Sequence, residues 1–344
     1  MAQKEKLDYT ALVRTLRAEG PGSLYLLWGE EDYLREQFAQ ELRRACLGEN
    51  DDGFDYKRFD GAAPDPVEVR EAADTLPFFA ERVYIELRGF DLNKCRAEDA
   101  ERFKAIFADL SDQCTMAIIL PSDYEPDGRL ALFKAIRKHG SAVHFTAQGQ
   151  QQLLRWIARR VEAGGKRIGR SEAEYLIFNC GELMTHLANE IGKLTHYVSG
   201  EEITRADIDA VTDRSTQASV FQMTDALAVR DYDTAARILA ELLGRRESPI
   251  MLLALIGRQL RQLLVARTAQ EYRLGSSYVA EVCGVTSDFV VRKLMDAARG
   301  FSLQQLAWAV ALCADTDYAM KSSSSDDEEL LVGLLLELAA GGAA

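Results

Sequence analysis

Residues 24–47 read LYLLWGEEDYLREQFAQELRRACL. The first five residues are apolar and run into Gly29, and a helical pattern follows, so the segment predicts a buried strand, a turn and a helix. Further apolar runs of strand length follow at residues 83–87, 116–120 and 142–145, with a weaker candidate at 56–59. Helical stretches lie between them, at about residues 66–75, 97–110 and 129–139. Short apolar strands that alternate with helices predict a parallel sheet covered on both faces.

The strand pattern ends after residue 146, and helical patterns replace it. Helices are predicted at residues 151–163, 171–179 and 182–198. Ser171 with Glu174, and Thr204 with Asp207, have the spacing of capping boxes at helix starts. In the third of these helices, apolar residues recur at steps of four and three and form one face: Leu183, Leu187, Ile191, Leu194 and Val198. These patterns predict a small helical domain that ends near residue 212.

The rest of the chain has helical patterns only. They are predicted at residues 220–229, 232–243, 249–273, 278–282, 288–299, 303–320 and 326–340. The fold class expected from the sequence is therefore α/β followed by all-α. Three domains are predicted: a parallel-sheet domain at residues 1–146, a small helical domain at 147–212 and a larger helical domain at 213–344.

The composition is that of an ordinary globular protein with an acidic balance. The 344 residues include 54 acidic and 41 basic side chains, for a net charge of −13. Such a chain is not expected to coat nucleic acid by itself, although DNA could pass near a local basic patch within a larger assembly. No apolar run approaches the roughly 18 residues of a membrane helix, and the first ten residues are too polar for a signal peptide. We expect a soluble protein.

The six cysteines are scattered and include no CxxC pair. Most of them have apolar neighbours, as reduced thiols in a core do. This usage predicts a cytoplasmic protein with neither disulfides nor a zinc site.

The turn that follows the first strand is the place to look for a phosphate-binding loop. Such a loop needs glycines, a lysine and a Ser or Thr in the pattern GxxxxGK[ST]. Residues 29–36 contain one glycine, no lysine and three successive acids at Glu30, Glu31 and Asp32, which would repel a triphosphate. We interpret these acids as residues that stabilise the start of the following helix.

Nothing else in the sequence predicts catalysis, a cofactor or a metal site. Asp91 and Asp123 are single carboxylates after strands, where turn formers are more common than metal ligands. The four histidines have no cysteine or histidine partner at metal-ligand spacing. We therefore expect a non-catalytic protein.

The positive signal is Leu76-Pro77-Phe78-Phe79, just before the strand predicted at residue 83. Pro77 disfavours helix at Leu76, so two adjacent phenylalanines fall in or beside a connecting loop. Two interpretations stay open at this point. The rings either cover the edge of the sheet or form an exposed aromatic anchor for a pocket of a partner protein.

In five segments, which include the two described above, the chain resembles the delta subunit of the bacterial DNA polymerase III clamp loader. The resemblance is carried, in order along nearly the whole chain, by residues 24–34, 76–79, 187–194, 220–227 and 317–321. It implies an AAA+-like α/β domain, a helical lid domain and a carboxy-terminal helical collar, without ATP binding or hydrolysis.

The resemblance also implies partners. The loop with Leu76, Pro77, Phe78 and Phe79 corresponds to the apolar wedge that binds a hydrophobic pocket of the ring-shaped sliding clamp, the beta subunit. The family commonly has a Leu-Phe pair where this chain has Phe78-Phe79, so the fit to the pocket could shift while the role survives. The collar implies assembly with gamma/tau and delta-prime subunits through helices near residues 249–273 and 326–340. The resemblance implies contact with DNA only within the assembly, and it implies no contact with a membrane.

Other classes of protein are alternatives to a delta subunit. An ATP-binding AAA+ clamp-loader subunit would carry an intact phosphate loop and a four-cysteine zinc module, and both are missing from the sequence. A delta-prime subunit is disfavoured by the same missing cysteines and by the aromatic loop. A helical DNA-binding module could use Arg258, Arg261 and Arg267 on one long helix, although a solvated face or a contact to a sister subunit suits an acidic chain better.

Overall fold

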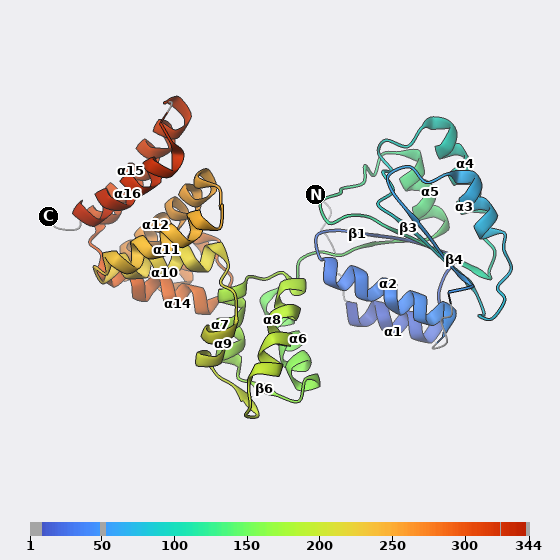
Figure 1. Ribbon diagram of the computed structural model, residues 1–344, viewed down its shortest axis with the longest axis horizontal. Helices are drawn as coiled ribbons and strands as arrows, with labels where there is room; N and C mark the ends of the chain where they lie inside the picture. Colours follow the sequence, from blue (N-terminus) through green and yellow to red (C-terminus); the bar gives the residue numbers. More distant parts are fainter. Residues whose placement is uncertain (1–8, 49–52, 324, 342–344) are drawn as a thin grey trace. The chain divides into compact units, whose positions relative to one another are not determined.

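The computed structural model describes residues 9–48, 53–323 and 325–341 (Figure 1). The chain divides into two compact units. Unit 1 consists of Met1–Gln148 with Leu183–Thr185, and unit 2 of Gly149–Glu182 with His186–Ala344.

Unit 1 is built on a five-stranded sheet in the order β2-β3-β4-β1-β5. The strands are β1 (Leu24–Trp28), β2 (Tyr56–Asp60), β3 (Val83–Arg88), β4 (Cys114–Ile119) and β5 (Ser141–His144). Every pairing is parallel, for example Leu26 beside Ile118 and Ile85 beside Met116. All five predicted strands are confirmed, including the weak one, which is weak because β2 is an edge strand with exposed Lys57 and Arg58.

Helices cover both faces of this sheet (Figure 1). They are α1 (Tyr9–Glu19), α2 (Asp32–Leu47), α3 (Pro66–Ala73), α4 (Ala97–Ala108) and α5 (Ala131–His139). α2 packs on one face with α1 against it, whereas α3, α4 and α5 pack on the other around Phe90, Phe103 and Phe107. The sequence analysis did not predict α1, in which Leu16 is the one buried residue.

The parallel arrangement gives the sheet two distinct edges. The carboxyl ends of the strands lie at one edge, where Gly29 follows β1. The amino ends lie at the other edge, where the α3–β3 connection enters β3 and residues 53–55 enter β2. The two segments singled out in the sequence therefore lie at opposite edges of one sheet.

Unit 2 begins with a small helical region. Its elements are α6 (Gln150–Ala163), β6 (Arg167–Ile168), α7 (Arg170–Cys180), α8 (Met184–Tyr197), β7 (Glu202–Ile203) and α9 (Arg205–Val211), with the first two residues of α8 assigned to unit 1. β6 and β7 pair in parallel. The expectation that strands end after residue 146 is wrong here, because a two-residue strand is too short to show an alternating pattern.

Two local predictions in this region are also wrong. Ser171 is not a helix cap, since α7 already begins at Arg170 after Gly169, and the Ser171 hydroxyl accepts a hydrogen bond from Arg205 instead. Leu183 lies outside α8 and is 62% exposed, while Met184 takes the buried position. The capping box of Thr204 with Asp207 at the start of α9 is confirmed.

The remaining helices form a bundle. They are α10 (Thr216–Ala228), α11 (Tyr232–Gly244), α12 (Pro249–Glu271), α13 (Ser276–Cys283), α14 (Asp288–Ala297), the short 3₁₀ helix η1 (Ala298–Gly300), α15 (Leu303–Ser322) and α16 (Asp327–Gly341). α12 is the central helix and packs against α10, α13, α14, α15 and α16. By length and composition alone α12 could cross a membrane, but half of that stretch is buried within the bundle, which accounts for its apolar character.

Candidate functional site

The loop between α3 and β3 carries the four residues singled out by the sequence. α3 ends at Ala73 and β3 begins at Val83, so all four lie in the connection. The exposed fractions are 74% for Leu76, 75% for Phe78 and 65% for Phe79, while Pro77 is half-buried. The two rings are therefore mainly exposed and do not cover the sheet edge.

A buried carboxylate holds the backbone of this loop. The Oδ1 of Asp55 accepts a hydrogen bond from the N–H of Phe78 at 2.7 Å, and its Oδ2 accepts from Phe79 and Ala80, each at 2.7 Å. The backbone oxygen of Asp55 accepts from the N–H of Tyr84 at 2.8 Å, which joins the same residue to the start of β3. Asp55 is 6% exposed, so these bonds are shielded from water.

The protonation of Asp55 follows from these contacts. Burial by itself raises the pKa of its carboxyl, but the N–H groups of Phe78, Ala80 and Phe79 outweigh burial, and the net pKa lies below its ordinary value. The carboxylate is therefore charged at neutral pH, and its bonds to the loop are of the strong, charge-assisted kind.

The rings at this edge form one cluster. The centroids of Phe78 and Phe79 are 4.5 Å apart with an interplanar angle of 80°. Phe54, the residue before Asp55, contributes a third ring at 6.1 Å from Phe78 and 5.7 Å from Phe79. Phe54 is 66% exposed, so three phenyl rings from two segments present apolar surface to solvent side by side.

Sequence reasoning missed Phe54 and Asp55. The pair directly precedes the weak β2 pattern, and an aspartate before a strand is ordinarily a turn former. Their position follows from the pairing seen in the structure, because the paired parallel strands β2 and β3 begin at the same sheet edge. Residues just before β2 therefore had to lie near the loop before β3.

The β1–α2 connection, at the opposite edge, is closed by its own groups. The Nη1 of buried Arg35 donates to the carbonyl oxygen of Gly29 at 2.5 Å, and the same guanidinium pairs with Asp32. The N–H of Glu31 donates to the carbonyl oxygen of Phe145 at 3.1 Å. A phosphate loop instead presents converging free N–H groups to its ligand. The Nη atoms of Arg35, the carboxylate of Asp32 and the N–H of Glu31 are therefore already engaged within the chain.

Glu31 shows how closely this connection is packed. Its side chain is buried, and burial raises the pKa of its carboxyl to about 7, against the N–H groups of Tyr33 and Met184 and with the help of Asp32 and Glu30. The shift arises from the packing of a carboxyl with too few donors. Within the described residues no cluster of three or more His, Cys, Asp or Glu side chains could hold a metal ion.

Comparisons with known proteins show the family of the chain. The family model of the DNA polymerase III delta subunit matches residues 25–146, and the model of its C-terminal domain matches residues 217–338. The chain belongs to the DNA polymerase III delta subunit family. Among the relatives of this delta-family chain, DNA polymerase III subunit delta of Bacillus subtilis (strain 168) is 27% identical over 322 residues, which is 92% of each chain. The probable DNA polymerase III subunit delta of Aquifex aeolicus (strain VF5) is 20% identical over 316 residues, 90% of this chain and 89% of the relative.

A solved structure agrees in fold. The Bacillus subtilis DNA clamp loader delta protein has a TM-score of 0.52 and 24% identity, and the match covers 96% of this chain and 99% of that chain. The expected fold class, an AAA+-like parallel-sheet domain followed by all-helical regions, is confirmed for this delta-family chain.

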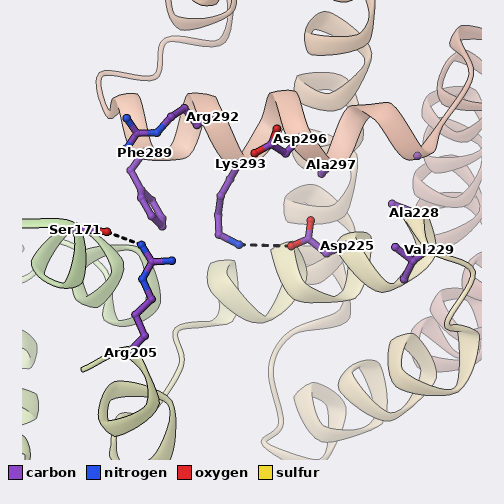
Figure 2. A pocket seen from close by; sticks show the side chains of 11 residues that line it. Ser171, Arg205, Asp225, Ala228, Val229, Phe289, Arg292, Lys293, Asp296 and Ala297 are labelled. Atoms are coloured by element: carbon purple, nitrogen blue, oxygen red, sulfur yellow. Dashed lines mark hydrogen bonds and ion pairs between the residues drawn. The ribbon is translucent and has the colours of Figure 1, made fainter. Parts of the chain in front are cut away.

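A cavity of about 530 Å³ lies in unit 2 of the delta-family chain (Figure 2). Its basic side chains already have partners: Lys293 pairs with Asp225 at 3.7 Å, Arg292 pairs with Glu174 at 3.4 Å, and Arg205 bonds Ser171. Because these charges are neutralised from within the chain, we assign the cavity no ligand.

The arginines of α12 were the basis of the DNA-binding alternative. Arg258 and Arg261 are exposed, whereas Arg267 is half-buried and bonds Gln270 at 3.1 Å. The three side chains therefore do not form one uniform basic surface, and no observation favours this alternative over the aromatic loop.

Proposed function

We propose that this chain binds the sliding clamp through the loop of Leu76, Pro77, Phe78 and Phe79 and stabilises the open form of the ring for loading onto primed DNA. The single observation that supports the proposal most is the exposed apolar loop held by Asp55 in a member of the delta family. Large exposed aromatic side chains on an ordered loop are the type of residue that dominates the free energy of protein association.

The mechanism we propose is state-selective binding. A protein shifts a ring toward its open form only to the extent that it binds the open form more tightly than the closed one. A hundredfold shift needs a difference of about 2.7 kcal/mol in binding free energy. An anchor of two rings and a leucine next to a subunit interface of the clamp could supply a difference of this size.

The same proposal gives the rest of the chain its roles. Residues 1–146 form the AAA+-like domain, 147–212 the lid and 213–344 the collar, which joins the gamma/tau and delta-prime subunits. The protein acts in the cytoplasm as a non-catalytic subunit, and DNA meets it only within the assembly. The self-closed connection between β1 and α2 supports a role without nucleotide hydrolysis.

The test is a calorimetric titration of the full chain against the sliding clamp from the same genome. We expect Phe78→Ala with Phe79→Ala to abolish measurable binding, because each anchor contributes roughly 2 kcal/mol or more. A fluorophore pair across the clamp's subunit interface reports opening in the same samples, and we expect the double variant to leave the ring closed.

Val67→Ala is the matched control, since Val67 is a 50% exposed apolar residue on neighbouring α3. It should bind as tightly as the unchanged chain. Unchanged affinity of the double variant, with an unchanged thermal unfolding curve, would contradict the proposal.

A further inference from the structure

We propose that Phe54 is a third anchor of this binding surface and that Asp55 is the positioning residue that holds the loop in its binding conformation before the partner arrives. The inference rests on the proposed function and deepens it: it states which side chains the partner's pocket must accept and why the loop is ready for them.

Phe54 meets the other rings across a long stretch of chain. It lies at the entry to β2, and Phe78 and Phe79 lie 24 and 25 positions later, at the entry to β3. The three rings nevertheless contact one another as tilted and edge-to-face pairs and stay mainly exposed. An exposed aromatic cluster of this kind is unfavourable in water unless a partner covers it. A pocket that accepts Phe78 and Phe79 therefore meets Phe54 at the same time.

Asp55 connects the third ring to the loop. One buried carboxylate receives three successive N–H groups, from Phe78, Phe79 and Ala80, so the backbone of the loop is bound at three consecutive residues. Its own backbone oxygen is bonded to β3 through Tyr84. Ordering a loop on association weakens binding, and a loop ordered beforehand avoids that loss.

The contribution of Phe54 is tested by Phe54→Ala in the full chain, titrated with the sliding clamp. We expect the affinity to fall about tenfold or more, as for a central interface aromatic. Tyr197→Ala is the matched control, because Tyr197 is an aromatic residue of similar exposure, 58%, on α8. It should leave the affinity unchanged.

The role of Asp55 is tested by Asp55→Asn, which keeps one acceptor oxygen of two, and by Asp55→Ala, which keeps none. We expect clamp affinity to fall about tenfold for Asp55→Ala and less for Asp55→Asn, with all rings present. Amide hydrogen exchange of residues 78–80 in the free protein should accelerate in the same order. A residue that only stabilised the fold would accelerate exchange throughout unit 1, so the local pattern separates the two roles.

The outcomes distinguish this inference from the proposed function. If the unchanged chain does not bind the clamp, the proposed function fails and the inference fails with it. If the Phe78/Phe79 double variant loses binding while Phe54→Ala binds normally, the third anchor is overturned and the proposed function stands. If Asp55→Asn and Asp55→Ala, shown to be folded by circular dichroism, keep both the affinity and slow exchange at residues 78–80, the positioning role is overturned.

Discussion

The two edges of the sheet in unit 1 carry two buried carboxylates in contrasting surroundings. Glu31, at the carboxyl edge, is 2% exposed, and its pKa is raised to about 7. Asp55, at the amino edge, is 6% exposed, and its pKa is lowered. Burial raises the pKa of both carboxyls, but it prevails only for Glu31, whereas for Asp55 the three N–H donors outweigh it. One acid is therefore poised to become neutral near neutral pH, and the other stays charged.

The contrast extends to the segments around them. At the carboxyl edge, the groups that could meet a nucleotide are engaged by Arg35 and by the backbone of Phe145. At the amino edge, the backbone is engaged by Asp55 while the side chains of Leu76, Phe78 and Phe79 face solvent. One edge of this sheet is therefore closed by groups of the chain, whereas the other presents apolar side chains to solvent.

The largest effect on stability is expected for Gly29→Ala, which tests whether the two edges are independent. Gly29 has a φ of 120°, and an added Cβ would lie 2.3 Å from the carbonyl oxygen of Phe145. Backbone strain and overpacking together should lower the free energy of unfolding by about 3 kcal/mol, measured by urea denaturation. Clamp affinity of the folded variant should not change, because the change lies at the other edge.

Gly128→Ala in the same unit is the control. Its Cβ would meet only the ring of Phe133 at 3.7 Å, an ordinary contact. Its stability should stay within about 0.5 kcal/mol of the unchanged chain. A folded Gly29→Ala protein with weakened clamp binding would show that the two edges are coupled.

A smaller effect, on the pH dependence of the free energy of unfolding, is expected for Glu31→Gln. The raised pKa means that folded Glu31 binds a proton more readily than unfolded Glu31 between pH 4.5 and about 7. The free energy of unfolding of the unchanged chain therefore falls as pH rises through this window, whereas the neutral glutamine does not titrate. Relative to the unchanged chain, Glu31→Gln should gain roughly 2 kcal/mol between about pH 5 and pH 8.

Urea denaturation at both pH values measures this difference. The effect of pH on stability has the opposite sign for Asp55. Its contribution to the free energy of unfolding is present at neutral pH and is lost only as pH falls below 3.8, through its lowered pKa. A stability difference between Glu31→Gln and the unchanged chain that is the same at both pH values would contradict our account of the Glu31 pKa.

The smallest effect is expected for Leu76→Ala. Leu76 is 74% exposed, so its removal should leave the free energy of unfolding within about 0.5 kcal/mol. Clamp binding should weaken by about 1 kcal/mol, less than for either phenylalanine, because leucine is seldom a dominant interface residue. Calorimetry and thermal unfolding on the same preparation check both parts, and a large loss of stability would mean that the loop is part of the core.

Much of the fold could be predicted from the sequence because it depends on local patterns. β1 lies where its apolar run placed it, and the capping box at Thr204 marks the start of α9. The loop at Leu76–Phe79 was also placed correctly, since Pro77 and the following strand limit it from both sides. Patterns of a few neighbouring residues were sufficient for these elements.

The features that could not be predicted from the sequence depend on contacts between residues that are distant along the chain. The side chain of Asp55 bonds to residues 23 to 25 positions away, and nothing near Asp55 in the sequence shows that partnership. Ser171 had the right spacing for a cap, but α7 begins at Arg170 with Gly169 at the cap position, two residues before the predicted cap. The positioning part of the candidate site therefore became visible only when β2 and β3 were paired.

The closed connection at Gly29 also has a consequence for the stability of the protein. A nucleotide-binding protein gains stability from its ligand and loses it when the ligand is scarce. A connection completed by Arg35 and the backbone of Phe145 folds without waiting for a small molecule. We therefore expect the free energy of unfolding of this chain to be independent of nucleotide concentration.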